Sequence, residues 1–124
     1  MKNIVNDLEK ALCGLREVLA ERKTDIVRDS AIKRFELCFD LVWKNAKNYA
    51  KDQGVECYSP RECIKVAYSL KLINDEQKWL ALLKDRNESV HLYSVETADG
   101  IYSRLGAYLT LFEDFLTVLE KIDR

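Results

Sequence analysis

The stretch RNESVHLY, residues 86–93, holds the only histidine of the chain. His91 stands five residues after Arg86 and two residues before Tyr93. An arginine guanidinium can hold a phosphate through charge-assisted hydrogen bonds, and a histidine, whose ordinary pKa is about 6.5, can exchange a proton near neutral pH. Together they suit metal-independent cleavage of an RNA phosphodiester. The arginine would stabilise the five-coordinate transition state, and the histidine would move a proton to or from the 2′-hydroxyl or the leaving oxygen.

The spacing of the two residues limits how they can act together. In a continuous helix, five residues correspond to about 140° of rotation and about 7.5 Å of rise, so Arg86 and His91 of one chain would not touch. Arg86 would instead share a face with Trp79 and Val90, partly toward the core. Joint action on one phosphate requires either that the helix breaks near Val90 or that two copies bring their motifs together. We therefore expect the motif at a helix end that faces a cleft, across a two-fold axis.

A purely structural interpretation of the same residues stays open at this point. His91 can stabilise the negative end of its helix, and Arg86 can pair with Asp85 or Glu88. Tyr93 would then be a packing residue. Residue types alone favour this interpretation.

Other chemical signatures are missing from the sequence. It has no glycine-rich phosphate loop, no GxSxG motif and no His, Cys and carboxylate cluster with metal-ligand spacing. We therefore expect no metal and no cofactor. The cysteines, which form no CxxC pair, are expected to be reduced packing residues; a disulfide between the last two is possible but not expected in a reducing compartment. They are Cys13, Cys38, Cys57 and Cys63.

Length and composition predict a single globular domain spanning residues 1–124. Hydrophobic residues make up 48% of the chain and charged residues 33%, with a formal net charge of −1. That balance argues against non-specific coating of nucleic acid. The first ten residues contain no apolar signal region, and no stretch is long and apolar enough to span a bilayer. We expect a cytoplasmic protein without a membrane segment.

Apolar residues recur with four-three spacing, which predicts helices and no strands. The expected helices run to about Glu21, from Thr24 or Asp25 to near Gly54, from Ser59 to about Lys71, from Asn74 to about Val90, and from Val95 to Ile122. The predicted fold is all-α: an antiparallel, four-helix-type bundle of about five helices. The apolar stripe of the last helix is wide enough to meet more than one neighbour, which favours a homodimer.

The chain resembles the HEPN superfamily, specifically its HepT-like branch, once described as nucleotidyltransferase substrate-binding proteins. The residues that carry this resemblance are RDSAIKRFELCFDLVWKNAKNYAKDQG (28–54), SPRECIKVAYSLKLI (59–73) and WLALLKDRNESVHLY (79–93). The branch pattern is R-x-x-x-x-H-x-Y with asparagine after the arginine. This chain matches it at every fixed position, with Arg86, Asn87, His91 and Tyr93. The resemblance covers about residues 3 to 122.

The resemblance implies a dimeric HEPN-like helical bundle in which the arginine and histidine of both copies line one cleft. It further implies a metal-independent ribonuclease toxin with Arg86 and His91 as catalytic residues and Asn87 as a supporting residue. The implied partner is an MNT-type nucleotidyltransferase antitoxin that transfers AMP from ATP onto Tyr93 and so silences the toxin. The alternative is a non-catalytic subunit that docks a nucleotidyltransferase or presents a substrate to it.

Basic residues on the second predicted helix have no assigned role. They can contact RNA or the partner, or they can be solvated surface. These residues are Arg28, Lys33, Arg34, Lys44 and Lys47.

Overall fold

The computed structural model describes residues 2–91 and 94–122, with side chains from Val5 onward. The described residues form five α-helices and no strand. The helices are α1 (Lys2–Leu19), α2 (Asp25–Asp52), α3 (Pro60–Ser69), α4 (Glu76–Ser89) and α5 (Val95–Ile122). The predicted all-α fold, with three long helices and two shorter ones, is confirmed.

Short polar residues begin the helices where the sequence suggests. Thr24 accepts a hydrogen bond from the backbone N–H of Val27 at the start of α2, and Ser59 accepts one from Glu62 ahead of Pro60 in α3. Helix α4 begins one residue later than expected, because Asp75 rather than Asn74 is its N-cap. Each cap satisfies a backbone donor that the first helical turn leaves free. Gly54, with φ of 81°, takes the left-handed conformation just after α2.

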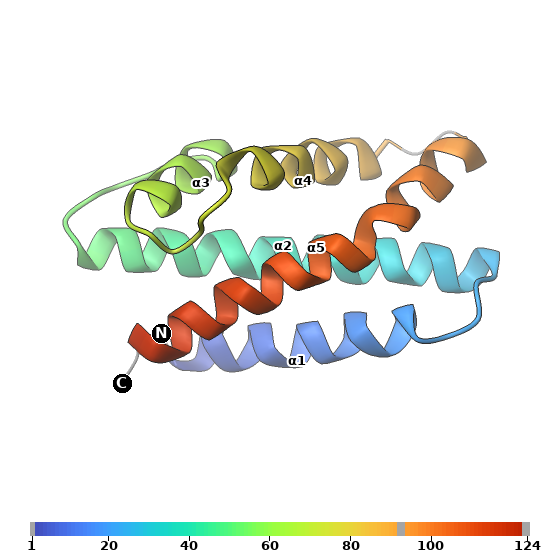
Figure 1. Cartoon of the computed structure of the whole chain (residues 1–124), viewed down its shortest axis with the longest axis horizontal. Coiled ribbons are helices and arrows are strands. Elements are labelled where there is room, and N and C mark those ends of the chain that lie inside the picture. Colours follow the sequence, from blue (N-terminus) through green and yellow to red (C-terminus); the bar gives the residue numbers. More distant parts are fainter. Residues whose placement is uncertain (1, 92–93, 123–124) are drawn as a thin grey trace.

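The helices form an antiparallel bundle around one core (Figure 1). Helix α2 runs opposite to α1 and to α4, and α5 crosses α2 diagonally on its way back from the far end of α4. Helix α2 contacts all the other helices. The predicted stripes of α1, α2 and α5 are largely buried. Aromatic residues meet in the centre, where Phe112 of α5 packs against Phe35 of α2 and Trp79 of α4.

The cysteines differ from the expectation. Cys57 and Cys63 form a disulfide between the loop after α2 and the first turn of α3, so the prediction that they are reduced packing residues is wrong. The six-residue separation and the turn before Pro60 bring the two Cα atoms within 5.2 Å. Cys38 is the expected packing cysteine, and burial raises the pKa of its thiol to about 12. Cys13 is exposed instead.

Among the described residues, no helix combines the length and the apolar character that crossing a bilayer requires.

Candidate functional site

The motif residues lie where α4 ends. Ser89 is the last residue of α4, Val90 caps the helix, and the backbone N–H of His91 donates to the carbonyl of Glu88 at 2.9 Å. The helix therefore stops near Val90, as one of the two sequence-based alternatives required. The chain nevertheless continues in a tightened helical turn at His91. With a rotation of about 100–120° per residue, the Cα–Cβ directions of Arg86 and His91 still differ by about 120–180°.

Arg86 lies against α2. Its guanidinium forms a 3.0 Å ion pair with Asp40 of α2 and lies over the ring of Phe39, 5.9 Å from the centroid. The side chain of Arg86 is 27% exposed, while its Nε atom is buried without a hydrogen-bond partner. The expected partners within α4, Asp85 and Glu88, do not pair with it. Among the described residues, Asp40 is the one side-chain acceptor for the Arg86 guanidinium, and the partly exposed side chain can still meet an anion.

A second contact fixes the last turn of α4 on α2. The hydroxyl of Ser89 donates to the carboxylate of Glu36 and also lies 2.7 Å from the carbonyl of Arg86. Ser89 is buried, and the Glu36 side chain is only 14% exposed. Lys33 pairs with Glu36 at 3.6 Å. Asp40 thus holds the start of the last turn of α4, at Arg86, and Glu36, one helical turn earlier in α2, holds its end, at Ser89.

The remaining motif residues are exposed or lie outside the described residues. Asn87 and His91 are exposed side chains, and Val90, which was expected to share a buried face with Arg86, is 55% exposed. Val90 leaves the core because α4 has already ended there. Tyr93 lies outside the described residues. The structure thus brings Arg86 together with Asp40 and Ser89 together with Glu36, and it shows no contact between Arg86 and His91.

The residue before Arg86 has a different environment. Asp85 is buried and accepts two hydrogen bonds from Arg104 of α5, at 2.6 and 3.0 Å, and one from the hydroxyl of Tyr108 at 2.5 Å. Burial, followed by the bond to Asp85, raises the pKa of Tyr108 to about 12. These bonds tie α4 to α5 and leave Asp85 saturated with partners, so it is not available for chemistry.

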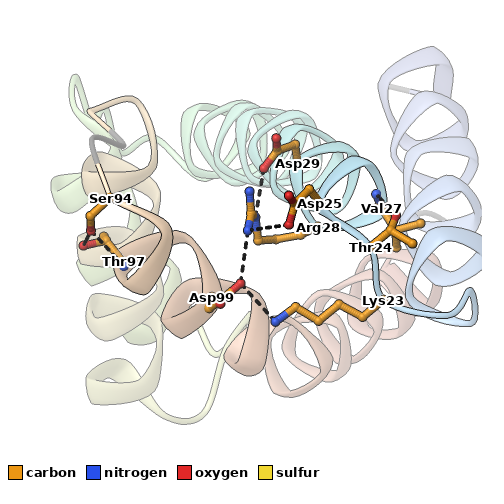
Figure 2. Close-up of polar contacts among 9 residues, drawn as sticks. All are labelled: Lys23, Thr24, Asp25, Val27, Arg28, Asp29, Ser94, Thr97 and Asp99. Carbon is orange, nitrogen blue, oxygen red and sulfur yellow. Dashed lines mark hydrogen bonds and ion pairs between the residues drawn. The ribbon is translucent and has the colours of Figure 1, made fainter.

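Polar contacts also anchor the first turns of α5, just after the motif (Figure 2). The Ser94 hydroxyl accepts from the backbone N–H of Thr97 and caps the helix. Asp99 pairs with Lys23 at 3.0 Å and with Arg28 at 3.3 Å. The hydrogen bond from Lys23, followed by that from Arg28, lowers the pKa of Asp99 below its ordinary value.

Arg28 itself is buried among carboxylates. Besides Asp99, it contacts Asp25 and Asp29, and its side chain is only 9% exposed. Neither role considered from the sequence, contact with RNA or a partner and solvated surface, fits this position. Arg28 instead joins the first turn of α2 to α5.

No group of three or more potential metal-ligating side chains occurs in the part of the chain that the structure describes. Glu36 and Asp40 were not predicted from the sequence to be neighbours of the motif. Their four-residue spacing, which places both carboxylates on one face of α2, is the sequence feature that could have indicated a shared contact.

Solved structures place the chain in a known class of fold. A protein from Thermus thermophilus is 35% identical, with 94% of this chain and 99% of that chain covered and a TM-score of 0.84. A Haemophilus influenzae protein, described as revealing the fold of a substrate binding domain of a nucleotidyltransferase, is 23% identical, covers 94% and 98%, and has a TM-score of 0.83. A tri-AMPylated HEPN toxin from Shewanella oneidensis, in complex with an MNT antitoxin, is 18% identical, covers 96% and 95%, and has a TM-score of 0.80. The fold is thus the HEPN-like helical bundle.

The sequence itself matches a family model. Residues 3–121 match the model described as "Nucleotidyltransferase substrate binding protein like". The chain belongs to this family, and the resemblance to the HepT-like branch is confirmed. No curated protein sequence matches the chain significantly.

Proposed function

We propose that this protein is a HepT-like toxin of a toxin–antitoxin pair, acting as a metal-independent ribonuclease in which Arg86 and His91 are the catalytic residues. The observation that carries the proposal is the state of Arg86. Its guanidinium is held by Asp40 in a partly exposed position, with no second carboxylate partner among the described residues, and the exposed His91 follows just beyond the end of the same helix. A guanidinium held in this way is prepared to bind a phosphate.

The proposed reaction is an internal transfer at phosphorus. One histidine removes the proton of a 2′-hydroxyl, the resulting oxygen attacks the adjacent phosphorus, and the 5′-oxygen of the next nucleotide leaves with a proton from an acid. The products are a 2′,3′-cyclic phosphate and a 5′-hydroxyl end. Arg86 stabilises the extra negative charge of the five-coordinate transition state. Asn87, exposed beside Arg86, supports the phosphate by hydrogen bonding.

The reaction needs both a base and an acid, but each chain has a single histidine. Arg86 and His91 also leave their helix in divergent directions. A homodimer meets both requirements, because the histidine of one copy can act as base while that of the other acts as acid, with the arginines of both copies lining one cleft. The proposed active form is therefore a homodimer.

The proposed regulator is an MNT-type nucleotidyltransferase. The Shewanella neighbour is described as tri-AMPylated and bound to an MNT antitoxin, which supports the same arrangement for this chain. The phenol oxygen of Tyr93 would attack the α-phosphorus of ATP and release pyrophosphate. The attached AMP would bring a negatively charged phosphodiester toward Arg86 and occupy the groups that otherwise bind RNA.

A second candidate is a non-catalytic subunit that docks a nucleotidyltransferase or presents a substrate to it. The net charge of −1 favours this candidate, because an RNA-cleaving protein benefits from a positive field. The description of the family points the same way.

RNA cleavage separates the two candidates. Purified wild-type protein should cleave tRNA or mRNA in the presence of a metal chelator, and folded His91→Ala should not. Expression of the wild type alone should arrest growth, which the same substitution should relieve. If wild-type protein leaves both RNAs intact with and without divalent metal, the docking candidate is favoured.

AMPylation is tested independently of cleavage. Intact-mass analysis after incubation with ATP and an MNT-type nucleotidyltransferase should show added AMP on the wild type and none on Tyr93→Phe. Unchanged modification of that variant would place the acceptor on another tyrosine.

A further inference from the structure

The outer face of α2 carries three lysines on the side opposite to the core. Lys44, Lys47 and Lys51 are all exposed, and their spacing of three and four residues aligns them along one side of the helix. The buried residues of the same segment, Val42, Ala46 and Ala50, face inward. The three lysines are called the lysine ridge below.

The lysine ridge lacks the carboxylate partners that other lysines have among the described residues. Four other lysines lie within 4.0 Å of a carboxylate: Lys23, Lys33, Lys65 and Lys78. Among the described residues, the three of the lysine ridge have no such partner. Lys47 lies instead over the ring of Trp43, 5.9 Å from its centroid. The ridge thus presents a concentrated positive charge on a protein whose overall charge is slightly negative.

The lysine ridge continues from the candidate site. Asp40, which holds Arg86, precedes Lys44 by one helical turn on the same side of α2. With 1.5 Å of rise per residue, Lys44 lies about 6 Å and Lys51 about 16 Å beyond Asp40 along the helix axis. A strand whose phosphate binds Arg86 can therefore reach the lysine ridge by following α2.

We propose that the lysine ridge is a binding track for the sugar–phosphate backbone of single-stranded RNA, leading from the cleaved phosphate toward the C-terminal end of α2. This inference rests on the proposed ribonuclease function and names the form of its substrate. A row of point charges contacts any sequence, so the track supplies affinity and direction rather than base specificity.

The composition of the surface favours a polyanion over a protein partner. Protein interfaces are depleted in lysine and contain apolar or aromatic residues at their centre. The lysine ridge has the opposite character: none of the exposed large hydrophobic side chains lies between residues 44 and 52. An alkyl-ammonium side chain suits the evenly spaced charges of a nucleic-acid backbone.

The test measures RNA binding apart from cleavage. Every protein carries His91→Ala so that the RNA stays intact, and binding of fluorescently labelled single-stranded RNA is followed by anisotropy over a range of salt concentrations. Replacing all three ridge lysines by glutamine should weaken binding about tenfold or more at about 0.1 M salt, and the slope of log K against log salt should fall by about 2. Replacing them by arginine should preserve the affinity.

A matched control removes three positive charges from other helices. Lys10, Lys84 and Lys121 are exposed on α1, α4 and α5, and their replacement by glutamine should leave RNA affinity within about twofold of the parent. Circular dichroism confirms that each variant is folded.

Equal loss in the ridge and control variants would overturn the proposal, because it would indicate a general effect of net charge. Unchanged RNA binding in the ridge variant would also overturn it. If that variant instead loses the MNT-type nucleotidyltransferase, the lysine ridge is a protein-docking surface. Loss of RNA binding only in the ridge variant supports the track even if wild-type protein cleaves no RNA, so the two proposals fail separately.

Discussion

Asp85 and Arg86 are consecutive residues of α4 with opposite environments. Asp85 is buried toward α5, where Arg104 and Tyr108 fill its capacity to accept hydrogen bonds. Arg86 points toward α2, where one carboxylate holds it and part of the side chain stays exposed. The step of about 100° between neighbours in a helix is enough to separate a structural contact from a chemical one. The comparison indicates that charge alone does not identify a site; unused bonding capacity and access also matter.

The largest effect on stability should come from Asp85. Asp85→Ala leaves the buried hydroxyl of Tyr108 and two guanidinium donors without their acceptor, so the free energy of unfolding should fall by about 2–3 kcal/mol. Arg86→Ala removes a partly exposed ion pair and should cost about 1 kcal/mol or less. Urea denaturation measures both. Equal losses would contradict the division of roles between the two residues.

RNA cleavage should show the reverse order, with Arg86 more important than Asp85. Arg86→Lys keeps the positive charge but loses the planar fork, and RNA cleavage should fall about 100-fold while the protein stays folded. A cleavage time course at matched protein concentration measures this. Activity close to that of the wild type would mean that a point charge suffices and that the guanidinium geometry has no special role.

Asp40 should have a smaller effect on cleavage. Asp40→Asn weakens the contact that orients Arg86, and we expect about a tenfold decrease, mainly in kcat. Asp114→Asn, at an exposed position of α5, is the matched control and should have no effect. An increase in cleavage or in RNA affinity would show that Asp40 competes with phosphate for Arg86 rather than positioning it.

The smallest effect concerns alkaline pH. Because the pKa of Tyr108 is raised to about 12 in the folded protein, its contribution to stability is present below its ordinary pKa of about 10 and is lost as the pH rises through about 12. Tyr108→Phe should therefore lose stability with pH less steeply than the wild type between about pH 10 and pH 12. Denaturant midpoints measured across that range compare the two proteins, and parallel curves would contradict the assignment.

The sequence predicted the parts of this fold that depend on local patterns. The caps at Thr24 and Ser59, the bounds of α5 and the buried stripes all follow from spacing within one helix. Contacts between helices depend on how the helices rotate against one another, which spacing within each helix does not specify. That is why the Asp40–Arg86 pair and the buried position of Arg28 could not be predicted.

The local structure around the motif could be predicted only in part, for the same reason. The helix end near Val90 follows from the sequence, whereas the exposure of Val90 does not, because helical periodicity no longer applies once the helix has ended. The resemblance to the HepT-like branch supplied the proposed roles of Arg86 and His91. Residue types alone favoured a structural interpretation.

The central claim is that Arg86 and His91 of two copies act in one cleft, and subunit mixing tests it most directly. Wild-type and His91→Ala chains are mixed in equal amounts, allowed to exchange subunits, and assayed for RNA cleavage at constant total protein. If both histidines of a dimer are required, only dimers of two wild-type chains are active, and activity should fall to about one quarter of the unmixed wild-type value. Activity near one half, proportional to the wild-type fraction, would show that a single histidine suffices and would contradict the account.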